Sequence, residues 1–252
     1  MYFDPTDRAA LKQHAKRCMK GCAPNIYLVS ILCLVLTNAP MLVTEGPTLR
    51  LMLQADSPQQ MLEIYQNGGP GGGFALTLAI MIMNIFLSLV MVGWKLYCLR
   101  ASREEEPGGA ETLFACFKQF WRFYCAQLLM SLFIMLWTFL FIIPGIIASY
   151  SYTQTFYIML DHPDMTPMEA IRASKQLMRG HKAEYFVLQL SFLGWALLTG
   201  FTFGLLQIWL EPYMQVTLAS YYNALINWRK PEPVSPEAEP QPFPDPEEWW
   251  KQ

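Results

Sequence analysis

Charged residues are scarce in this chain. Asp, Glu, Lys and Arg together make up 15% of its 252 residues, whereas hydrophobic residues make up 53% and aromatic residues 14%. A soluble domain carries about 25% charged residues, and the mean hydropathy of this chain is positive, at +0.21. The shortage of charge excludes an ordinary soluble domain and predicts an integral membrane protein.

Common catalytic motifs are also absent. The sequence has no HExxH zinc-protease motif, no Walker A motif and no Ser-His-Asp set in a recognisable context. The net charge of −2 gives no excess of positive charge for binding a nucleic acid. We therefore expect a protein that is not an enzyme, with no catalytic residue, no cofactor and no nucleic-acid partner.

Two weaker patterns could hold a metal ion. His14, Cys18 and Cys22 share one helical face, but structural zinc usually takes four ligands and the sequence offers no fourth one nearby. The turn DHPD at residues 161–164 offers three potential ligands, although Asp and Pro also suit a turn before a helix. We predict no metal site and keep an intramembrane enzyme acting on lipid at this turn as the least favoured alternative.

Uncharged windows long enough to cross a bilayer, which takes ~20 helical residues, recur along the chain. They predict six spans, near residues 24–43, 74–94, 123–143, 146–160, 185–209 and 212–228. The third and fourth spans share one uncharged run, which Pro144 and Gly145 divide because Pro removes a backbone donor and Gly permits a tight turn. The predicted fold is all-α, a polytopic membrane helix bundle of six transmembrane helices with amphipathic interfacial helices.

Lysine and arginine positions set the predicted orientation. With both termini in the cytoplasm, all of the 18 lysines and arginines except Arg50 lie on the cytoplasmic side, where such residues are retained. This topology divides the chain into a cytoplasmic amphipathic segment (1–22), a membrane domain (23–230) and a disordered, acidic, Pro-rich tail (231–252). The expected location is the bacterial cytoplasmic membrane, and the expected contacts include anionic headgroups of its inner leaflet.

The stretch DMTPMEAIRASKQLMRG contains the clearest local signal in the sequence. Thr166 stands three residues before Glu169, with Pro167 between them, which predicts a capped helix start. The helix should run over residues 166–180, in the plane of the membrane, with one apolar and one basic side. The basic residues expected to contact lipid headgroups are Arg172, Lys175, Arg179 and Lys182.

The predicted spans also contain uncharged polar side chains. Tyr150, Thr153, Gln154 and Tyr157 recur at i, i+3, i+4 and i+7, the spacing of one helical face. We interpret this polar face as hydrogen-bonding groups between helices, with the lining of a small polar cavity as the alternative.

Several short runs resemble a known family. They include IPGII at residues 143–147, DHPD at 161–164, MRGHK at 178–182 and LSFLGW at 190–195, followed by Pro212-Tyr213 and Tyr221-Tyr222. Over roughly residues 8 to 228 the chain resembles the bacterial integral membrane family named domain of unknown function 975. The resemblance implies a protein with several membrane spans, and because the family has no established activity, it implies no catalytic residue.

These observations favour a non-catalytic membrane component that organises lipid or a protein partner, which can be a second copy of the chain. The alternative is a permease or exporter of a small amphiphile or peptide, favoured by the polar face at residues 150–157.

Overall fold

The computed structural model describes residues 4–22, 25–55, 57–60, 74–202 and 204–229. All regular elements in these ranges are helices. They are α1 (Arg8–Gly21), α2 (Asn25–Leu53), α4 (Phe74–Ser102), the 3-10 helix η1 (Ala110–Gln119), α5 (Phe120–Leu140), α6 (Ile142–Ser151), α7 (Thr155–Asp161), α8 (Pro167–Leu177), α9 (Lys182–Phe201) and α10 (Gln207–Arg229). The predicted tail at 231–252 lies outside the described residues.

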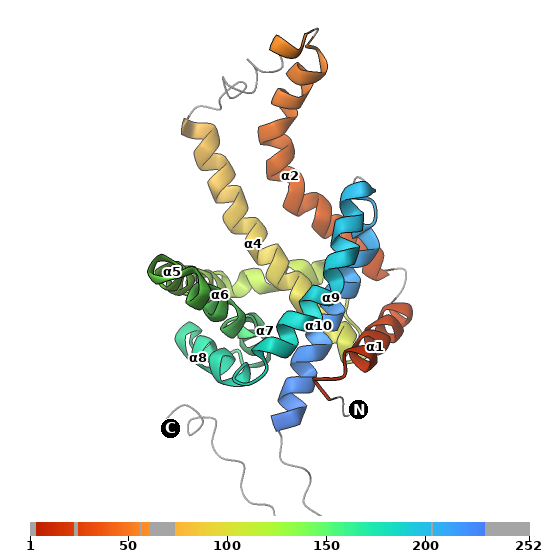
Figure 1. The fold of residues 1–252 in the computed structure, drawn as a ribbon, viewed down its shortest axis with the longest axis vertical. Coiled ribbons are helices and arrows are strands. Elements are labelled where there is room, and N and C mark those ends of the chain that lie inside the picture. Colours follow the sequence, from red (N-terminus) through yellow and green to blue (C-terminus); the bar gives the residue numbers. More distant parts are fainter. Residues whose placement is uncertain (1–3, 23–24, 56, 61–73, 203, 230–252) are drawn as a thin grey trace, which may run out of the picture.

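Helices α4 and α10 form the centre of the fold. Helix α10 contacts α1, α2, α4 and α9, and α4 also contacts η1 and α7. Their aromatic side chains are among the largest fully buried groups, including Trp94, Tyr97, Tyr221 and Tyr222. Away from this centre, α2 and α4 run side by side and then diverge, whereas α1 and the last turn of α10 lie at the opposite end (Figure 1).

The structure does not confirm all six predicted membrane spans. Three helical segments are long and apolar enough to cross a bilayer, namely Leu78–Ser102, Ala110–Leu140 and Lys182–Phe201. A fourth candidate arises if α1 and the Asn25–Pro40 part of α2, joined at a bend of 98°, count as one broken span. The described residues thus give three or four candidate spans.

Two of the predicted spans differ from the structure for identifiable reasons. Residues 146–160 do not form one helix, because α6 ends at Ser151 and α7 begins at Thr155. Residues 212–228 do form a helix as part of α10, but its buried polar side chains, including Thr217 and Ser220, lower the hydropathy of the segment. These buried polar side chains lie where α10 packs against α1, α2, α4 and α9.

The predicted hairpin is present, but its turn lies earlier than expected. Phe141 is extended, with φ −158° and ψ 143°, and separates α5 from α6. Pro144 sits in the first turn of α6, where a backbone N–H has no intrahelical acceptor and its loss costs little. Gly145 allows close packing, since a Cβ at this position would overlap Thr138 of α5. Phe141 therefore makes the turn between the two helices. Pro144 suits the first turn of α6, and Gly145 lets α6 pack closely against α5.

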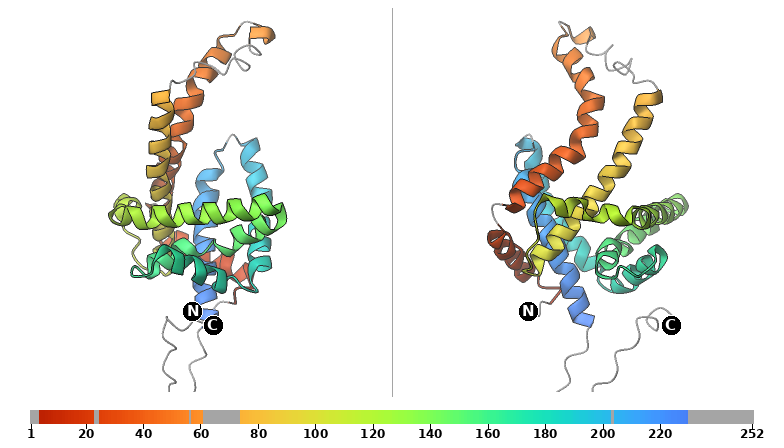
Figure 2. Two further views of the ribbon diagram at one scale, coloured as in Figure 1. Left: turned by 90° about the vertical axis from the view of Figure 1, so that its left-hand side faces the viewer. Right: turned by 180° about the vertical axis from the view of Figure 1, so that it is seen from behind.

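Helices η1 and α5 lie crosswise to α2 and α4 (Figure 2, left). Membrane-spanning helices tilt by up to about 40° from the bilayer normal. If α4 crosses the bilayer, α5 therefore lies closer to the membrane plane, and the candidate Ala110–Leu140 is then not a span perpendicular to the membrane. The outer surface of the α5–α6 hairpin suits such a position, because Phe139, Phe141 and Ile143 are 89%, 68% and 73% exposed and such apolar area is favourable in lipid and costly in water.

Helix α8 begins where the sequence predicts. Thr166 is its N-cap, Pro167 is its first residue, and Glu169 completes a capping box. The Thr166 amide donates to Glu169 Oε2 at 2.8 Å, and the Glu169 amide donates to Thr166 Oγ1 at 3.4 Å. The bond from the Thr166 amide is the main cause of a lowered pKa at Glu169. The predicted helix cap is confirmed. It was predictable because the capping box depends only on the four residues from Thr166 to Glu169.

We expect Thr166→Ala to lower the free energy of unfolding by about 1 kcal/mol, because an alanine N-cap leaves the Glu169 amide without its acceptor. Thermal unfolding in detergent measures the change. Thr199→Ala is the matched control, since the Thr199 hydroxyl donates only to the Ala196 carbonyl of its own helix. Equal stability of the two variants would contradict a structural role for the cap.

Candidate functional site

A cavity of about 710 Å³ lies between α4, α5, α6 and α9. Long apolar side chains of α5 line one side, including Met130, Ile134, Met135 and Phe139, together with the polar Gln127, Ser131 and Thr138 of the same helix. The other surfaces contribute Lys95, Ser149, Thr153 and Tyr185. The cavity therefore combines a positive charge, hydroxyl groups and an apolar wall.

Lys95 is the charged residue of this cavity. Its Nζ atom lies 5.1 Å from the centre of the Tyr157 ring, within the range of a cation–π contact. No Asp or Glu lines the cavity, and the ion pairs found among the described residues are Arg103–Asp161 and His181–Glu184. The charge of Glu211 acts on Lys95, but the two residues do not form an ion pair among the described residues. A half-buried ammonium group without a paired carboxylate favours an anionic ligand, because pairing offsets the cost of its desolvation.

The sequence places Lys95 at a span end, where its side chain would reach the interface. In the structure α4 continues to Ser102, so Lys95 lies inside the candidate span Leu78–Ser102. The predicted span ends at Trp94 because Lys95 is charged, so the sequence does not predict Lys95 to lie within the span. A lysine among otherwise uncharged residues is the signal that could have identified this position.

The predicted polar face at residues 150–157 is divided by the break between α6 and α7. Thr153 lines the cavity, whereas the Tyr150 ring contacts the rings of Tyr185 and Phe186. Gln154 and Tyr157 are buried, and Tyr157 stacks on Tyr222 at 5.2 Å between ring centres. The i, i+3, i+4, i+7 spacing implies a shared face only in a continuous helix, and a turn at residues 152–154 interrupts it.

The break between α6 and α7 is held by α8. The Ser174 hydroxyl of α8 donates to the Ser151 backbone carbonyl at 2.8 Å and accepts from the Gln154 backbone N–H at 3.2 Å. The Gln154 Oε1 and Tyr157 Oη atoms are buried without a hydrogen-bond partner among the described residues. Unsatisfied buried oxygens of this kind are costly, and neither residue lines the cavity.

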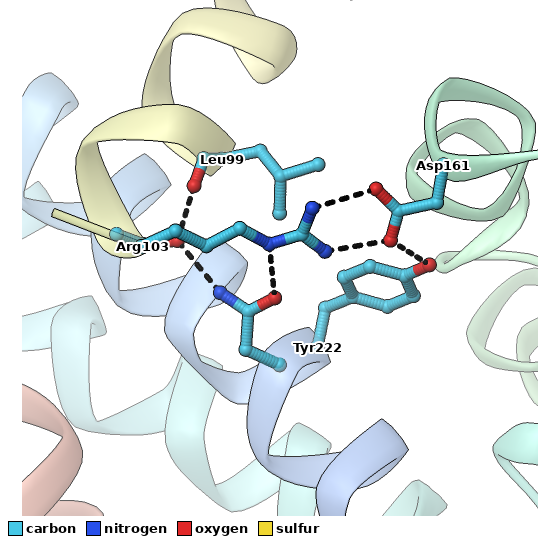
Figure 3. Close-up of polar contacts among 6 residues, drawn as sticks. Leu99, Arg103, Asp161 and Tyr222 are labelled. Atoms are coloured by element: carbon cyan, nitrogen blue, oxygen red, sulfur yellow. Dashed lines mark hydrogen bonds and ion pairs between the residues drawn. The ribbon is translucent and has the colours of Figure 1, made fainter. Parts of the chain in front are cut away.

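An ion pair closes the end of the bundle near α1 (Figure 3). Arg103 donates from Nη1 and Nη2 to the two Asp161 carboxylate oxygens at 2.8 and 2.6 Å, and Tyr222 Oη donates to Asp161 Oδ2 at 2.9 Å. Asn223 accepts from Arg103 Nε at 3.0 Å and donates to Ser102 Oγ at 2.9 Å. Burial opposes the charge of Arg103, but the hydrogen bond and the charge of Asp161 raise its pKa. This network joins α4, α7 and α10.

The side chains of the DHPD turn do not form a cluster of potential metal ligands within the described residues. Asp161 is paired with Arg103, and the His162 carbonyl accepts from Arg122 Nη2 at 2.6 Å. His162 and Asp164 are exposed, and no described residues of this turn belong to a potential metal cluster. The turn connects α7 to the cap of α8.

The basic residues predicted to contact lipid lie on one side of α8 and at the start of α9. Arg172, Lys175 and Arg179 are exposed and Lys182 is half-buried. On the opposite side of α8, Ala170, Ile171, Ser174 and Leu177 are buried, where the helix contacts α5, α6 and α7. Contact between this basic edge and headgroups stays a prediction.

The described chain is all-helical, with several helices long and apolar enough to cross a membrane, which points to an integral membrane protein. Residues 140–229 match the family model described as Protein of unknown function (DUF975). The match confirms the family resemblance over α6 to α10, a shorter segment than the resemblance predicts. Searches of the curated proteins and of the solved structures find no match to the chain.

Proposed function

We propose that this protein is a non-catalytic component of a bacterial cytoplasmic membrane that binds an anionic amphiphile, such as a phospholipid, in the Lys95 cavity. The observation that carries the proposal is Lys95 itself, a cation that makes no ion pair among the described residues and lines a cavity together with apolar side chains of α5. The ammonium group would pair with a phosphate or carboxylate. The acyl chain would lie against Met130, Ile134 and Met135 of α5.

The position of the cavity supports a lipid ligand. Helix α5 lies crosswise to α4 (Figure 2), and the exposed apolar side chains of its hairpin suit a lipid environment. Helices α1 and α8 and the C-terminal end of α4 carry basic residues. They lie on the side of the bundle opposite the C-terminal end of α2 and the N-terminal end of α4 (Figure 1), as expected for a cytoplasmic face. An inner-leaflet lipid could thus enter the cavity from the side.

The proposal is tested by native mass spectrometry of the full chain after delipidation, with phosphatidylglycerol and phosphatidylcholine as probes. We expect one tightly bound phosphatidylglycerol and a roughly tenfold or greater loss of affinity in Lys95→Met, because a charge-assisted contact contributes ~1.5–3 kcal/mol. Lys118→Met, which removes an exposed lysine of η1, is the matched control. Equal affinity of wild type and Lys95→Met, or no preference for phosphatidylglycerol, would contradict the proposal.

A permease of a small amphiphile is the second candidate. The observation that favours it is the turn at Tyr152 and Thr153, which interrupts α6–α7 and lines the cavity. Secondary transporters bind substrates at discontinuous helices of this kind. Transfer of a fluorescent anionic lipid between leaflets of proteoliposomes separates the two functions: transfer that depends on Lys95 favours a permease, and binding without transfer favours the non-catalytic component.

A further inference from the structure

We propose that the cytoplasmic end of the bundle carries a site for a divalent transition metal of the Zn²⁺ type, held by His14, Cys18 and Glu104. One ligand atom from each residue lies within 4.8 Å of the other two. Within the described ranges, this is the one group of three or more His, Cys, Asp or Glu side chains found so close together. The site is independent of the Lys95 cavity.

The spacing of the two ligands on α1 already fits a metal. Cys18 Sγ lies 3.9 Å from His14 Nδ1 and 3.4 Å from His14 Nε2. A zinc ion binds nitrogen at ~2.1 Å and sulfur at ~2.3 Å, so two such ligands at the tetrahedral angle are about 3.6 Å apart. A side-chain movement of a few tenths of an ångström would bring both atoms to coordination distance, and both residues are buried on one face of the helix.

The imidazole of His14 also makes a hydrogen bond typical of a metal-binding histidine. His14 Nε2 lies 3.0 Å from the Ser102 carbonyl oxygen. A carbonyl only accepts, so Nε2 carries the ring proton and Nδ1 is the ring nitrogen that would bind a metal. Cys18 Sγ lies closer to Nε2 than to Nδ1, so the ring would have to rotate to direct the Nδ1 lone pair at a shared ion. Metal-binding histidines commonly donate their second ring N–H to a carbonyl or carboxylate, which fixes the tautomer and the orientation of the ring.

Glu104 adds the third ligand from a helix end of unusual backbone geometry. The Glu105 amide donates to the Arg100 carbonyl at 3.1 Å and the Glu104 amide donates to the Ala101 carbonyl at 3.2 Å, the pattern of a Schellman motif with Glu104 at the left-handed position. Its φ is 59°, a conformation in which glycine is usual because a Cβ is strained. A glutamate here costs stability, and a ligand role for its carboxylate accounts for that cost.

The ligand set defines the chemistry of the site. Nitrogen, sulfur and carboxylate oxygen from three residues suit Zn²⁺ and leave a fourth position for water. On binding, the Cys18 thiol would release its proton to solvent as the metal–sulfur bond forms. A cavity of about 760 Å³ lined by Cys18, Glu104 and Arg17 gives an ion access to these groups. The bound ion would fix α1 to the end of α4.

Cobalt absorption spectroscopy on the full chain tests the proposal, with the protein purified in detergent without a polyhistidine tag. Titration with Co²⁺ should produce a sulfur-to-cobalt charge-transfer band in the near ultraviolet, and Zn²⁺ should remove it. We expect Cys18→Ser to abolish the band and Glu104→Gln to weaken Co²⁺ affinity roughly tenfold or more. Cys22→Ser is the matched control and should retain the wild-type band, since Cys22 lies one turn away and outside the cluster.

A second variant keeps the test valid if a cluster substitution affects folding. Glu104→Gly should lose Co²⁺ affinity to the same extent as Glu104→Gln, while the melting temperature of the metal-free protein rises by a few degrees because glycine relieves the left-handed strain. The proposal is overturned by absence of the charge-transfer band in wild type. A band lost in Cys22→Ser and retained in Cys18→Ser, or wild-type affinity in both Glu104 variants, also overturns it.

Discussion

Gly93→Ala should destabilise the protein by about 3 kcal/mol or more, at the upper end of the range for overpacking. Gly93 of α4 is buried against η1, and a Cβ at this position would overlap the carbonyl oxygen, carbonyl carbon and Cα of Leu113. These are backbone atoms, so no change of side-chain rotamer relieves the overlap. Thermal unfolding in detergent should show a large fall in melting temperature.

Gly194→Ala is the matched control for this experiment. Gly194 lies within α9, is exposed, and has no atom within 4 Å of an added Cβ. Alanine is favoured over glycine inside a helix by ~0.5–1 kcal/mol, so the control should be neutral or slightly more stable. A Gly93→Ala variant as stable as Gly194→Ala would show that η1 does not pack on α4 as described.

Asp161→Leu should cost about 2 kcal/mol, because it leaves Arg103 without its bidentate partner and Tyr222 without its acceptor. The effect is smaller than for a fully buried pair, since the Arg103 and Asp161 side chains are 32% and 17% exposed and water can reach the unpaired group. Chemical or thermal unfolding in detergent measures the loss.

A double-mutant cycle separates the ion pair from other effects of the substitution. Arg103→Leu combined with Asp161→Leu should destabilise the protein by about 1–2 kcal/mol less than the sum of the two single changes. Each single change already removes the whole ion pair, so the sum counts its loss twice, whereas the double variant loses it once. Glu184→Leu, which removes the ion pair His181–Glu184 within one helical turn, should cost only about 0.5 kcal/mol. Strict additivity would mean that Arg103 and Asp161 do not stabilise each other.

Features encoded by a few adjacent residues were predictable from the sequence. The start of α8 depends on Thr166, Pro167 and Glu169 alone, and the structure has the capping box that they predict. The hairpin was also predictable, because an uncharged run of that length must fold back in a bilayer. Its turn was misplaced by a few residues, since Phe141 carries no turn signal and adopts its extended conformation through the packing of α5 on α6.

Features that depend on tertiary packing were not predictable. The break at residues 152–154 is held by Ser174, which lies twenty or more positions later in the chain, and no local signal marks the break. The position of Lys95 inside α4 depends on the helix continuing to Ser102. Likewise, the sequence brings His14 and Cys18 together through helical spacing, but only the fold adds Glu104.

Photocrosslinking tests the central claim, that the Lys95 cavity binds an anionic amphiphile, most directly. A phosphatidylglycerol analogue with a photoreactive acyl chain would be incorporated in nanodiscs with the full chain, and crosslinked peptides identified by mass spectrometry. The account predicts label on residues 127–139 and 149–153, which line the cavity, and a strong reduction in Lys95→Met but not in Lys118→Met. Absence of label from these residues, or equal labelling in Lys95→Met and wild type, would contradict it.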